Sequence, residues 1–363
     1  MSLSDEDYMR LALDLAERGR FSARPNPMVG AVVVKSDQIV GTGFHAKPGT
    51  GHGEVQALAE VPDDVARGST IYVNLEPCDF TGRTPPCSDL LLDKKVARVV
   101  CALKDPDSQV SGSGIKKLRE AGVEVVVGVL AERAERLNAA YLTHRRQGRP
   151  YVTLKIAQSL DGSSATHSGV SKWITGPQAR KRGHTLRAES QAVAVGIGTV
   201  LMDDPELTVR NVPGGQPIKV VFDSHLRTPL DARVLEGGEC IIVTIEKADI
   251  KCVEGLRERG AEVLQIKSTD QPDVISALKV LAEREIIHVL VEGGSRLASS
   301  FLRERVVDRV AVFTSPKLIG GYPSVPDIGI ETMEETLGFE NVVEERVGSD
   351  RLLVADVKYP VRW

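Results

Sequence analysis

The order of apolar and polar positions over the first part of the chain predicts alternating helices and strands. Residues 5–18 carry apolar side chains every three or four positions, which predicts an amphipathic helix that ends before the proline-containing segment 24–27. Two apolar runs, residues 29–35 and 38–44, flank Ser36 and Asp37 and predict a hairpin of two buried strands. The chain therefore begins with a helix that is followed by paired strands.

The same alternation continues to residue 147. Further helices are predicted over residues 53–61, 88–95, 115–121 and 131–147, and further strands over residues 70–75, 97–103 and 123–127. This order is typical of an α/β protein and fits a three-layer α/β/α sandwich. The polar segment HRRQGRP (144–150) contains glycine and proline and suits a domain boundary. We therefore expect one domain over residues 1–147 and a second over residues 148–363.

The composition of the chain argues against several classes of protein. The 363 residues are 42% hydrophobic and 26% charged, with a formal net charge of −4, so no basic surface for a nucleic-acid backbone is evident. No apolar run is long enough for a membrane span, and the acidic start SLSDED does not resemble a secretory signal. The five cysteines are odd in number and scattered, which favours a reducing compartment. We expect a cytoplasmic protein with a small-molecule substrate and neither nucleic-acid nor membrane partners; a homo-oligomer is left open.

Candidate metal chemistry lies in the first domain. A catalytic zinc needs three protein ligands, an open position and a nearby carboxylate that moves protons. His52, Cys78 and Cys87 supply the ligands and Glu54 the carboxylate. The pattern resembles the H-x-E and P-C-x-x-C signature of zinc deaminases, although the two cysteines here are nine positions apart. The alternatives are a surface histidine with core thiols, or a structural zinc site, for which no fourth cysteine or histidine stands nearby.

The loop between Cys78 and Cys87 is longer than the P-C-x-x-C signature allows, and this length connects the motifs to one family. The segments NPMVG (26–30), LEPC (75–78), GRTPPC (82–87) and DP (105–106) resemble the deaminase half of the bifunctional riboflavin-biosynthesis deaminase/reductase. This resemblance implies a cytidine-deaminase-like fold and the substrate 2,5-diamino-6-(5-phosphoribosylamino)pyrimidin-4(3H)-one. It further implies that the substrate pocket is lined by Asn26, His45, Arg83, Thr84 and Asp105. The alternative is that Asn26 only forms a turn and that Arg83 and Thr84 only order the loop.

Some positions depart from the pattern of that family. Gly53 stands where the family usually has alanine, residues 79–81 read DFT in place of Ser-His-aromatic, and residues 107–108 read DS in place of Asn-Pro. Phe80 cannot form the hydrogen bonds of a histidine, and Asp79 and Asp107 add negative charge near a phosphorylated substrate. We therefore predict weaker substrate binding with a nearly intact chemical step.

The second domain resembles the reductase half of the same family. The resemblance rests on YVTLKIA (151–157), SLDG (159–162), SKWIT (171–175), VGIGTV (195–200) and VEGGS (291–295), and it implies a dihydrofolate-reductase-like α/β fold that uses NADPH. The residues themselves predict a buried strand at 289–291, a glycine turn and a helix at 296–302, whose first amides could hold a phosphate. A purely geometric glycine turn is equally compatible with this pattern. No G-x-G-x-x-G follows a first strand, which disfavours a Rossmann fold.

The resemblance also assigns residues in the second domain. It implies NADPH contacts at Ala157, Trp173, Thr199, Asp203, Ser224, Gly294, Ser295, Arg296, Leu297, Ala298, Ser299 and Ser300. It implies substrate contacts at Ser171, Arg187, Leu207, Arg210 and Glu292. Arg187 and Arg210 suit a ribose phosphate because guanidinium groups bind phosphate with two hydrogen bonds; salt bridges to protein carboxylates are the alternative.

The leading interpretation is therefore a bifunctional enzyme. Hydrolytic removal of the 2-amino group as ammonia would be followed by hydride transfer to C1′ of the ring-opened ribosyl imine, which gives a ribityl chain. A cytidine- or tRNA-adenosine-type deaminase fused to an unrelated domain is the second interpretation, but it leaves the C-terminal motifs unexplained. A zinc-stabilised binding protein without turnover is the third.

Overall fold

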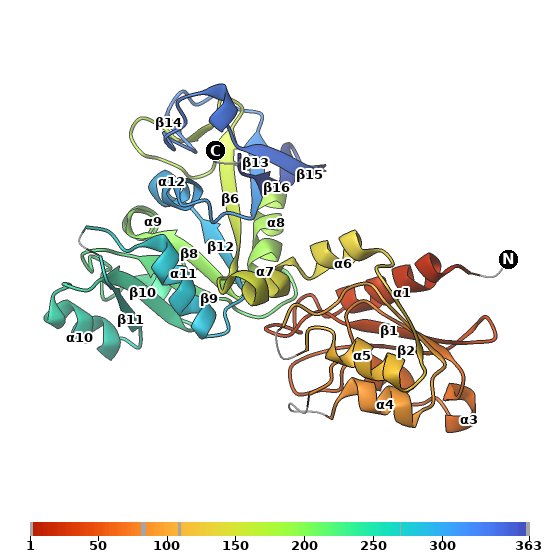
Figure 1. The fold of residues 1–363 in the computed structure, drawn as a ribbon. Helices are drawn as coiled ribbons and strands as arrows, with labels where there is room; N and C mark the ends of the chain where they lie inside the picture. The colour runs from red at the N-terminus through yellow and green to blue at the C-terminus, as the bar shows by residue number, and fades with distance from the viewer. Residues whose placement is uncertain (1–2, 81–84, 108–109, 269, 361–363) are drawn as a thin grey trace. The chain divides into compact units, whose positions relative to one another are not determined.

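The computed structural model describes residues 3–80, 85–107, 110–268 and 270–360, and these form two compact units, Met1–Gly148 and Arg149–Trp363 (Figure 1). Each unit has its own sheet and is considered by itself. No helix within the described part of the chain is long and apolar enough to cross a membrane.

The first unit is built on a mixed sheet with the strand order β2-β1-β3-β4-β5. Strand β1 pairs antiparallel with both β2 and β3, whereas β3, β4 and β5 are parallel. The strands are β1 (Gly30–Lys35), β2 (Gln38–Phe44), β3 (Thr70–Val73), β4 (Arg98–Cys101) and β5 (Glu124–Val127). The helices are α1 (Asp5–Glu17), α2 (Gly53–Leu58), α3 (Asp63–Ala66), α4 (Cys87–Asp93), α5 (Ser113–Glu120), α6 (Ala131–Leu137) and α7 (Ala139–Gln147).

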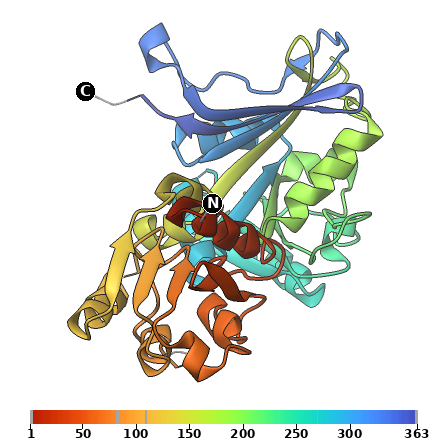
Figure 2. The same cartoon turned by 90° about the vertical axis from the view of Figure 1, so that its right-hand side faces the viewer.

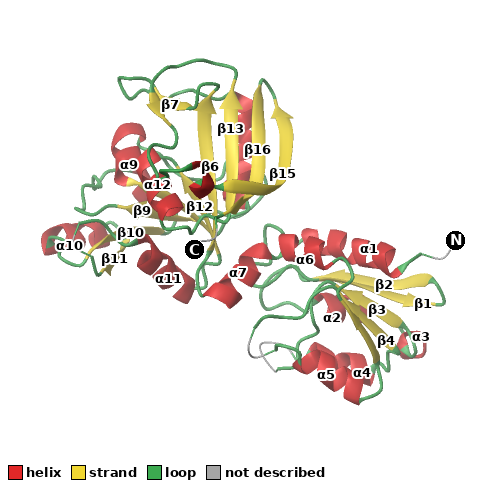
Figure 3. Ribbon diagram, turned by 45° about the horizontal axis from the view of Figure 1, so that its top comes forward, coloured by secondary structure: helices red, strands yellow, loops and turns green. Residues whose placement is uncertain are grey.

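Glycines allow helices to approach both faces of this sheet. A Cβ atom at Gly30 of β1 would lie 2.2 Å from the carbonyl oxygen of Ala12 in α1, and one at Gly43 of β2 would lie 2.3 Å from the amide nitrogen of Ala57 in α2. Gly30 pairs with Phe44 and Gly43 pairs with Ala31, so the two glycines point to opposite faces. Helix α1 therefore covers one face and α2 the other, which confirms the predicted three layers (Figure 3).

The predicted helix 131–147 is wrong in one respect, because the structure divides it into α6 and α7 at Asn138. The Asn138 side chain accepts a hydrogen bond from the backbone nitrogen of Met28 at 2.8 Å and donates to the Met28 carbonyl at 2.9 Å. Asn138 is buried, and its backbone (φ −102°, ψ 19°) leaves the helical region. The asparagine thus ends α6 in order to hold the segment that precedes β1.

The second unit is built on a larger sheet with the order β11-β10-β9-β8-β12-β6-β13-β16-β15. The first seven strands of this order, from β11 through to β13, are parallel. Strands β16 and β15 extend the sheet beyond β13 in antiparallel pairing and form the long blue hairpin of Figure 2. The strands are β6 (Tyr151–Ser159), β7 (Ser163–Ala165), β8 (Ala192–Gly196), β9 (Ile218–Phe222), β10 (Cys240–Ile245), β11 (Glu262–Ile266), β12 (His288–Glu292), β13 (Arg309–Ser315), β14 (Tyr322–Pro323), β15 (Gly338–Val347) and β16 (Asp350–Lys358). The helices are α8 (Pro177–Ala188), α9 (Ile197–Asp203), α10 (Ile250–Glu258), α11 (Val274–Glu283) and α12 (Ser295–Arg303), and short 3₁₀ helices occur at η1 (Arg233–Leu235) and η2 (Met333–Glu335).

Two hydrophobic cores lie on the two faces of the larger sheet. One core joins alternate strand residues to α11 and α12, and the other joins the remaining strand residues to α8 and α10. Because both faces are covered, the carboxyl ends of the parallel strands are left as the edge at which loops meet. The expected α/β architecture is confirmed in both units.

Candidate active sites

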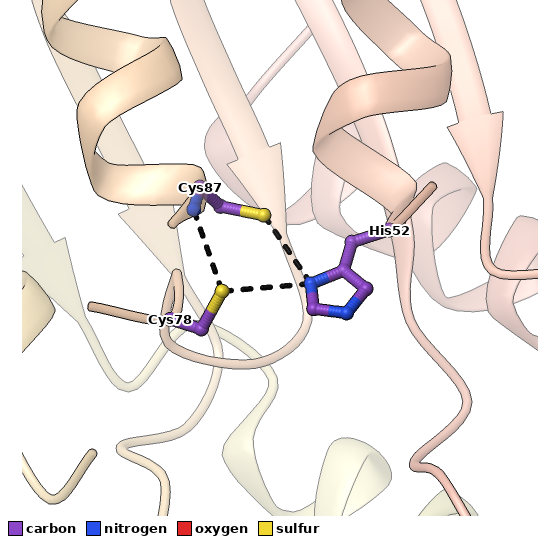
Figure 4. A group of neighbouring side chains, drawn as sticks. All are labelled: His52, Cys78 and Cys87. Carbon is purple, nitrogen blue, oxygen red and sulfur yellow. Dashed lines mark hydrogen bonds between the residues drawn. The ribbon is translucent and has the colours of Figure 1, made fainter. Parts of the chain in front are cut away.

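Three metal-binding side chains meet in the first unit. His52 immediately precedes α2, Cys87 is the first residue of α4, and Cys78 lies in the loop that follows β3. Figure 4 shows the imidazole directed at the two thiols from the neighbouring helix. Their ligand atoms all lie within 4.8 Å of one another. The loop of nine positions thus brings the second cysteine beside the first.

The distances within this cluster suit a shared cation. The Nδ1 atom of His52 lies 3.5 Å from Sγ of Cys78 and 3.3 Å from Sγ of Cys87. The backbone nitrogen of Cys87 donates to Sγ of Cys78 at 3.4 Å. Hydrogen bonding by Cys87 and His52 lowers the pKa of the Cys78 thiol, which favours the thiolate form that binds metals. One imidazole and two thiolates, with no fourth ligand among the described residues, form the donor set of a catalytic zinc site.

Glu54 lies beside the cluster without belonging to it. Its side chain is buried in the first turn of α2, and burial raises its pKa to about 7. Its Oε2 atom has no hydrogen-bond partner among the described residues. A buried carboxylate oxygen normally has a partner, so this atom is free to contact a bound water or substrate. A pKa near neutrality suits a group that both accepts and donates a proton.

Two of the predicted pocket residues contact each other next to His52. The His45 ring meets the His52 ring edge to face, with centroids 5.5 Å apart. Nδ2 of Asn26 lies 3.0 Å from Nε2 of His45, and Nδ1 of His45 lies 3.3 Å from the carbonyl oxygen of Gly51. Donation by the Asn26 amide and acceptance by Gly51 assign the His45 proton to Nδ1. Asn26 therefore orients His45, in addition to forming a turn.

Sequence reasoning gave no role to Glu76, which organises the loop behind the cysteines. Its buried carboxylate accepts hydrogen bonds from the backbone nitrogens of Asp105 at 3.1 Å, Gly112 at 2.9 Å and Ile115 at 3.2 Å. Asp105 is itself buried, and the hydroxyl of Tyr141 donates to both of its carboxylate oxygens. Burial raises the pKa of Asp105 to about 6. The LEPC segment signalled Glu76, but its distant backbone partners could not be read from sequence.

The structure corrects the expected effect of the unusual acidic residues. Asp79 contacts the Lys117 ammonium at 2.7 Å and accepts a hydrogen bond from Ser88, and Asp107 lies 3.2 Å from Arg145. Both charges are therefore balanced by neighbouring cations and should not repel a phosphate as predicted. Phe80 is 39% exposed.

Gly53 is a further departure from the family pattern that the structure describes, whereas the departures Thr81 and Ser108 lie outside the described residues. A Cβ atom at Gly53 would lie 3.0 Å from the carbonyl oxygen of Val29, so the usual alanine would require a local shift. The predicted pocket residues Arg83 and Thr84 lie outside the described residues.

A cavity of about 910 Å³ opens at the carboxyl ends of the parallel strands in the second unit. Its lining includes every predicted substrate-contact residue of this unit, namely Ser171, Arg187, Leu207, Arg210 and Glu292. It also includes the predicted cofactor-contact residues Ala157, Trp173, Thr199, Asp203, Ser224, Gly294, Ser295, Arg296, Leu297, Ala298 and Ser300. Ser299 is not in the lining and is buried on α12. Residues far apart in sequence are thus gathered around one space.

Arg187 and Glu292 both line this cavity and form an ion pair that is largely shielded from solvent. Its Nε and Nη2 atoms donate to the two carboxylate oxygens of Glu292 at 2.7 and 2.9 Å, and Nη1 donates to the carbonyl oxygen of Thr208. Burial opposes the charge on Glu292, but the guanidinium outweighs it and lowers the pKa of Glu292 to about 2. If Arg187 contacts the ribose phosphate as expected, its guanidinium group must bind the phosphate and Glu292 at the same time.

This ion pair gives a prediction about stability. Glu292→Gln should lower the free energy of unfolding of the second unit by about 3 kcal/mol at pH 7, because the buried Arg187 charge loses its partner. The folded pKa lies below the value of 4.5 for the unfolded chain, so the contribution is complete above pH 4.5 and is lost as the pH falls toward 2. Urea unfolding followed by tryptophan fluorescence measures this unit, because Trp173 and Trp363 both belong to it.

The matched control is Glu283→Gln, which changes an exposed carboxylate of α11 in the same unit. The difference between wild type and Glu292→Gln should shrink between pH 7 and pH 3, whereas the control should match wild type throughout. Equal stability of Glu292→Gln and wild type at pH 7 would show that the pair contributes nothing.

Arg210 also has a carboxylate partner. Arg210 and Arg233 both form ion pairs with Glu206, one with each of its carboxylate oxygens. All three residues line the cavity. The two guanidinium groups therefore converge on one position, where an anionic group of a ligand would compete with Glu206.

The turn that follows β12 is shaped for a close contact with a ligand. Gly293 and Gly294 have φ angles of +90° and +79°, which favour glycine, and a Cβ atom on Gly293 would lie 3.2 Å from Oγ1 of Thr199. Helix α12 begins directly afterwards at Ser295. Its first backbone amides have no partner within the helix and can bind a phosphate. The glycine turn and the first amides of α12 together form a phosphate cradle, which fits the pyrophosphate of a dinucleotide.

Family models match both halves of the chain. Residues 2–103 match the cytidine and deoxycytidylate deaminase zinc-binding region, and residues 150–351 match the RibD C-terminal domain. The first match covers the His52, Cys78 and Cys87 cluster, and the second covers the cavity.

Full-length relatives agree with both matches. The chain is 46% identical over 350 residues to the riboflavin biosynthesis protein RibD of Aquifex aeolicus, which covers 96% of this chain and 97% of that protein. It is 39% identical to RibD of Escherichia coli, with 96% and 98% covered. A solved structure of Acinetobacter baumannii RibD has a TM-score of 0.88 at 38% identity and covers 98% of this chain and 99% of its own. The Thermotoga maritima diaminohydroxyphosphoribosylaminopyrimidine deaminase/5-amino-6-(5-phosphoribosylamino)uracil reductase has a TM-score of 0.84 at 36% identity, with the same coverage.

Proposed function

The chain belongs to the RibD family of riboflavin-biosynthesis proteins, and from this premise we propose that its two units divide the two reactions between them. Members of the family are bifunctional deaminases and reductases, so the chain is an enzyme that acts on a small-molecule pyrimidine with zinc and NADPH as cofactors. The observation that carries the division is the separation of the metal-binding cluster and the cavity into different compact units.

In the first unit, we assign His52, Cys78 and Cys87 as the zinc ligands and Glu54 as the proton carrier. Zinc, when bound, activates a water molecule for attack on the ring carbon that bears the 2-amino group. Glu54 would take one proton from that water and deliver it to the ring nitrogen, and would then carry the remaining proton of the added hydroxyl to the amino group, which departs as ammonia while the ring carbon keeps the oxygen. The unpartnered Oε2 atom and the pKa of about 7 support this role for Glu54. His45 and Asn26 would orient the pyrimidine beside it.

In the second unit, the lining residues position the deaminated ribotide against the dinucleotide. NADPH supplies the hydride, and the protein fixes the distance and angle of its transfer to C1′. Arg210, with Arg233 beside it, is placed to hold the ribose phosphate in exchange for Glu206. Arg187 would keep Glu292 ionised and fixed as an acceptor for donors on the substrate.

We also propose that the enzyme acts on a free ribotide in the cytoplasm without nucleic-acid partners. The net charge of −4 and the five cysteines, none of them in a disulfide, support this location and this class of substrate.

Product analysis with labelled cofactor tests this function. Zinc-loaded full-length protein would be incubated with the diaminopyrimidine ribotide and NADPH that carries deuterium at the transferred position. Mass spectrometry should find a product that has lost one amino group and gained one deuterium at C1′ of a ribityl chain. Loss of the amino group without incorporation of deuterium would reject the reductase assignment, and no change in the ribotide would reject both.

The position of Phe80 allows a test of substrate binding. Phe80→His should raise kcat/KM for deamination, mainly through a lower KM, because the imidazole can form a hydrogen bond that phenylalanine cannot. One hydrogen bond to a charged group is worth about 1.5 to 3 kcal/mol, so the gain should be roughly tenfold or more. Since Asp79 and Asp107 are paired, the effect should differ little between low and high salt. Steady-state ammonia release measures it, and an unchanged KM would show that the loop does not use this position for binding.

A further inference from the structure

Helix α7 contacts two segments that carry predicted pocket residues of the first unit. Just before its first turn, Asn138 exchanges two hydrogen bonds with the backbone of Met28, which lies two positions after Asn26. One turn later, the hydroxyl of Tyr141 lies 3.0 and 3.1 Å from the two carboxylate oxygens of Asp105. Residues three positions apart share one face of a helix, so α7 fixes both segments from the same side.

The contact between Tyr141 and Asp105 leaves room for a ligand on the carboxylate. Both side chains are buried, each with 6% of its surface exposed. Oδ1 of Asp105 also accepts a hydrogen bond from the backbone nitrogen of Asp107 at 2.9 Å, whereas Oδ2 has only the Tyr141 hydroxyl as a donor among the described residues. A carboxylate oxygen can accept two hydrogen bonds, so Oδ2 keeps one acceptor position for a ligand.

Arg145, one turn further along α7, supports this arrangement. Its Nε atom lies 3.2 Å from Oδ2 of Asp107, and its guanidinium group stacks over the Tyr141 ring at 5.5 Å from the centroid. Burial raises the pKa of Asp105 to about 6, and the hydrogen bond from Tyr141 opposes that rise. The hydroxyl therefore favours the ionised carboxylate, which accepts hydrogen bonds and donates none.

The backbone of Asp105 is tied to the segment that carries a metal-binding cysteine. Its nitrogen donates to the carboxylate of Glu76, two positions before Cys78. A pyrimidine with amino groups and a ring N–H offers donors to an ionised carboxylate. We propose that Tyr141 is a positioning residue of the deaminase site, which orients Asp105 so that Oδ2 accepts a hydrogen bond from an N–H group of the pyrimidine. The inference rests on the proposed deamination in this unit.

A double-mutant cycle on the zinc-loaded full-length chain tests the proposal. Steady-state ammonia release from the diaminopyrimidine ribotide would be measured for wild type, Tyr141→Phe, Asp105→Asn and the variant with both changes. Tyr141→Phe should raise KM about tenfold and leave kcat nearly unchanged, because the weakened contact binds the substrate and takes no part in the chemical step. Asp105→Asn should raise KM at least as much. The double variant should match Asp105→Asn, because Tyr141 acts only through the carboxylate.

The matched control is Tyr72→Phe, which removes another buried tyrosine hydroxyl of the first unit. This hydroxyl donates to a carboxylate oxygen of Asp5 at 2.8 Å and joins β3 to α1, so its loss should leave KM at the wild-type value. Metal analysis should find one zinc per chain in every variant, which shows that the first unit is folded around its cluster. Loss of zinc from Tyr141→Phe would show that the tyrosine maintains the fold, and would overturn the positioning role.

The remaining outcomes separate this inference from the function on which it rests. An unchanged KM in Tyr141→Phe or Asp105→Asn, or an equal rise in Tyr72→Phe, would overturn the role of Tyr141 and leave the deaminase assignment in place. A KM of the double variant well above that of Asp105→Asn would do the same. Failure of the zinc-loaded wild-type chain to release ammonia would overturn the deaminase assignment and this inference with it.

Discussion

Glu54→Gln should lower kcat for ammonia release by about a hundred- to ten-thousandfold, the usual contribution of a positioned proton carrier, while the protein keeps its zinc. The amide has nearly the shape of the carboxylate but cannot take up a proton from water. Glu54 is buried, and its Oε2 atom has no hydrogen-bond partner among the described residues. Steady-state deamination together with metal analysis measures both parts of the result.

The control for this variant is Glu60→Gln, which changes an exposed carboxylate just beyond the same helix. The control should deaminate at the wild-type rate. NADPH oxidation by Glu54→Gln on the already deaminated ribotide should also be normal, since that reaction uses the other unit. Normal ammonia release by Glu54→Gln would refute the proposed role of the carboxylate.

Cys87→Ala should abolish zinc binding and deamination together. Two protein ligands remain in this variant, which is fewer than the three that hold a catalytic zinc. Cys101→Ala is the matched control, because Cys101 is also a buried free cysteine of the first unit but does not belong to the cluster. Its removal therefore leaves the proposed ligand set of His52, Cys78 and Cys87 complete.

Metal analysis of the purified variants distinguishes the two cysteines. Wild type and Cys101→Ala should hold one zinc per chain, and Cys87→Ala should hold none. If Cys87→Ala kept a full complement of zinc, the metal would have to lie elsewhere and the proposed ligand set would be wrong.

The sequence predicted the local elements well, and it named the three side chains that the structure brings together in the cluster, because both depend on short-range patterns. The hairpin of β1 and β2 lies where the two apolar runs placed it, but only β1 is buried as predicted, whereas β2 is largely exposed or half-buried. The break at Asn138 was missed because it comes from a hydrogen bond to Met28, which is 110 positions away. Helix α2 also ends at Leu58, earlier than predicted, and the short helix α3 follows it.

The ion-pair partners of the charged site residues could not be predicted from the sequence. Asp79 was expected to repel the substrate, yet Lys117 of helix α5 neutralises its charge. Arg187 was interpreted as a phosphate ligand, yet Glu292, 105 positions away, occupies two of its donors. Charges are evident in a sequence, but their pairing depends on the tertiary fold.

The most direct test of two separable reactions in one chain is an assay of Cys87→Ala with each substrate in turn. We predict that this variant releases no ammonia from the diaminopyrimidine ribotide and oxidises no NADPH in its presence. With the deaminated ribotide it should oxidise NADPH at the wild-type rate, because the cavity lies in the second unit. Ammonia release by the variant, or loss of NADPH oxidation on the deaminated ribotide by a folded variant, would contradict the account.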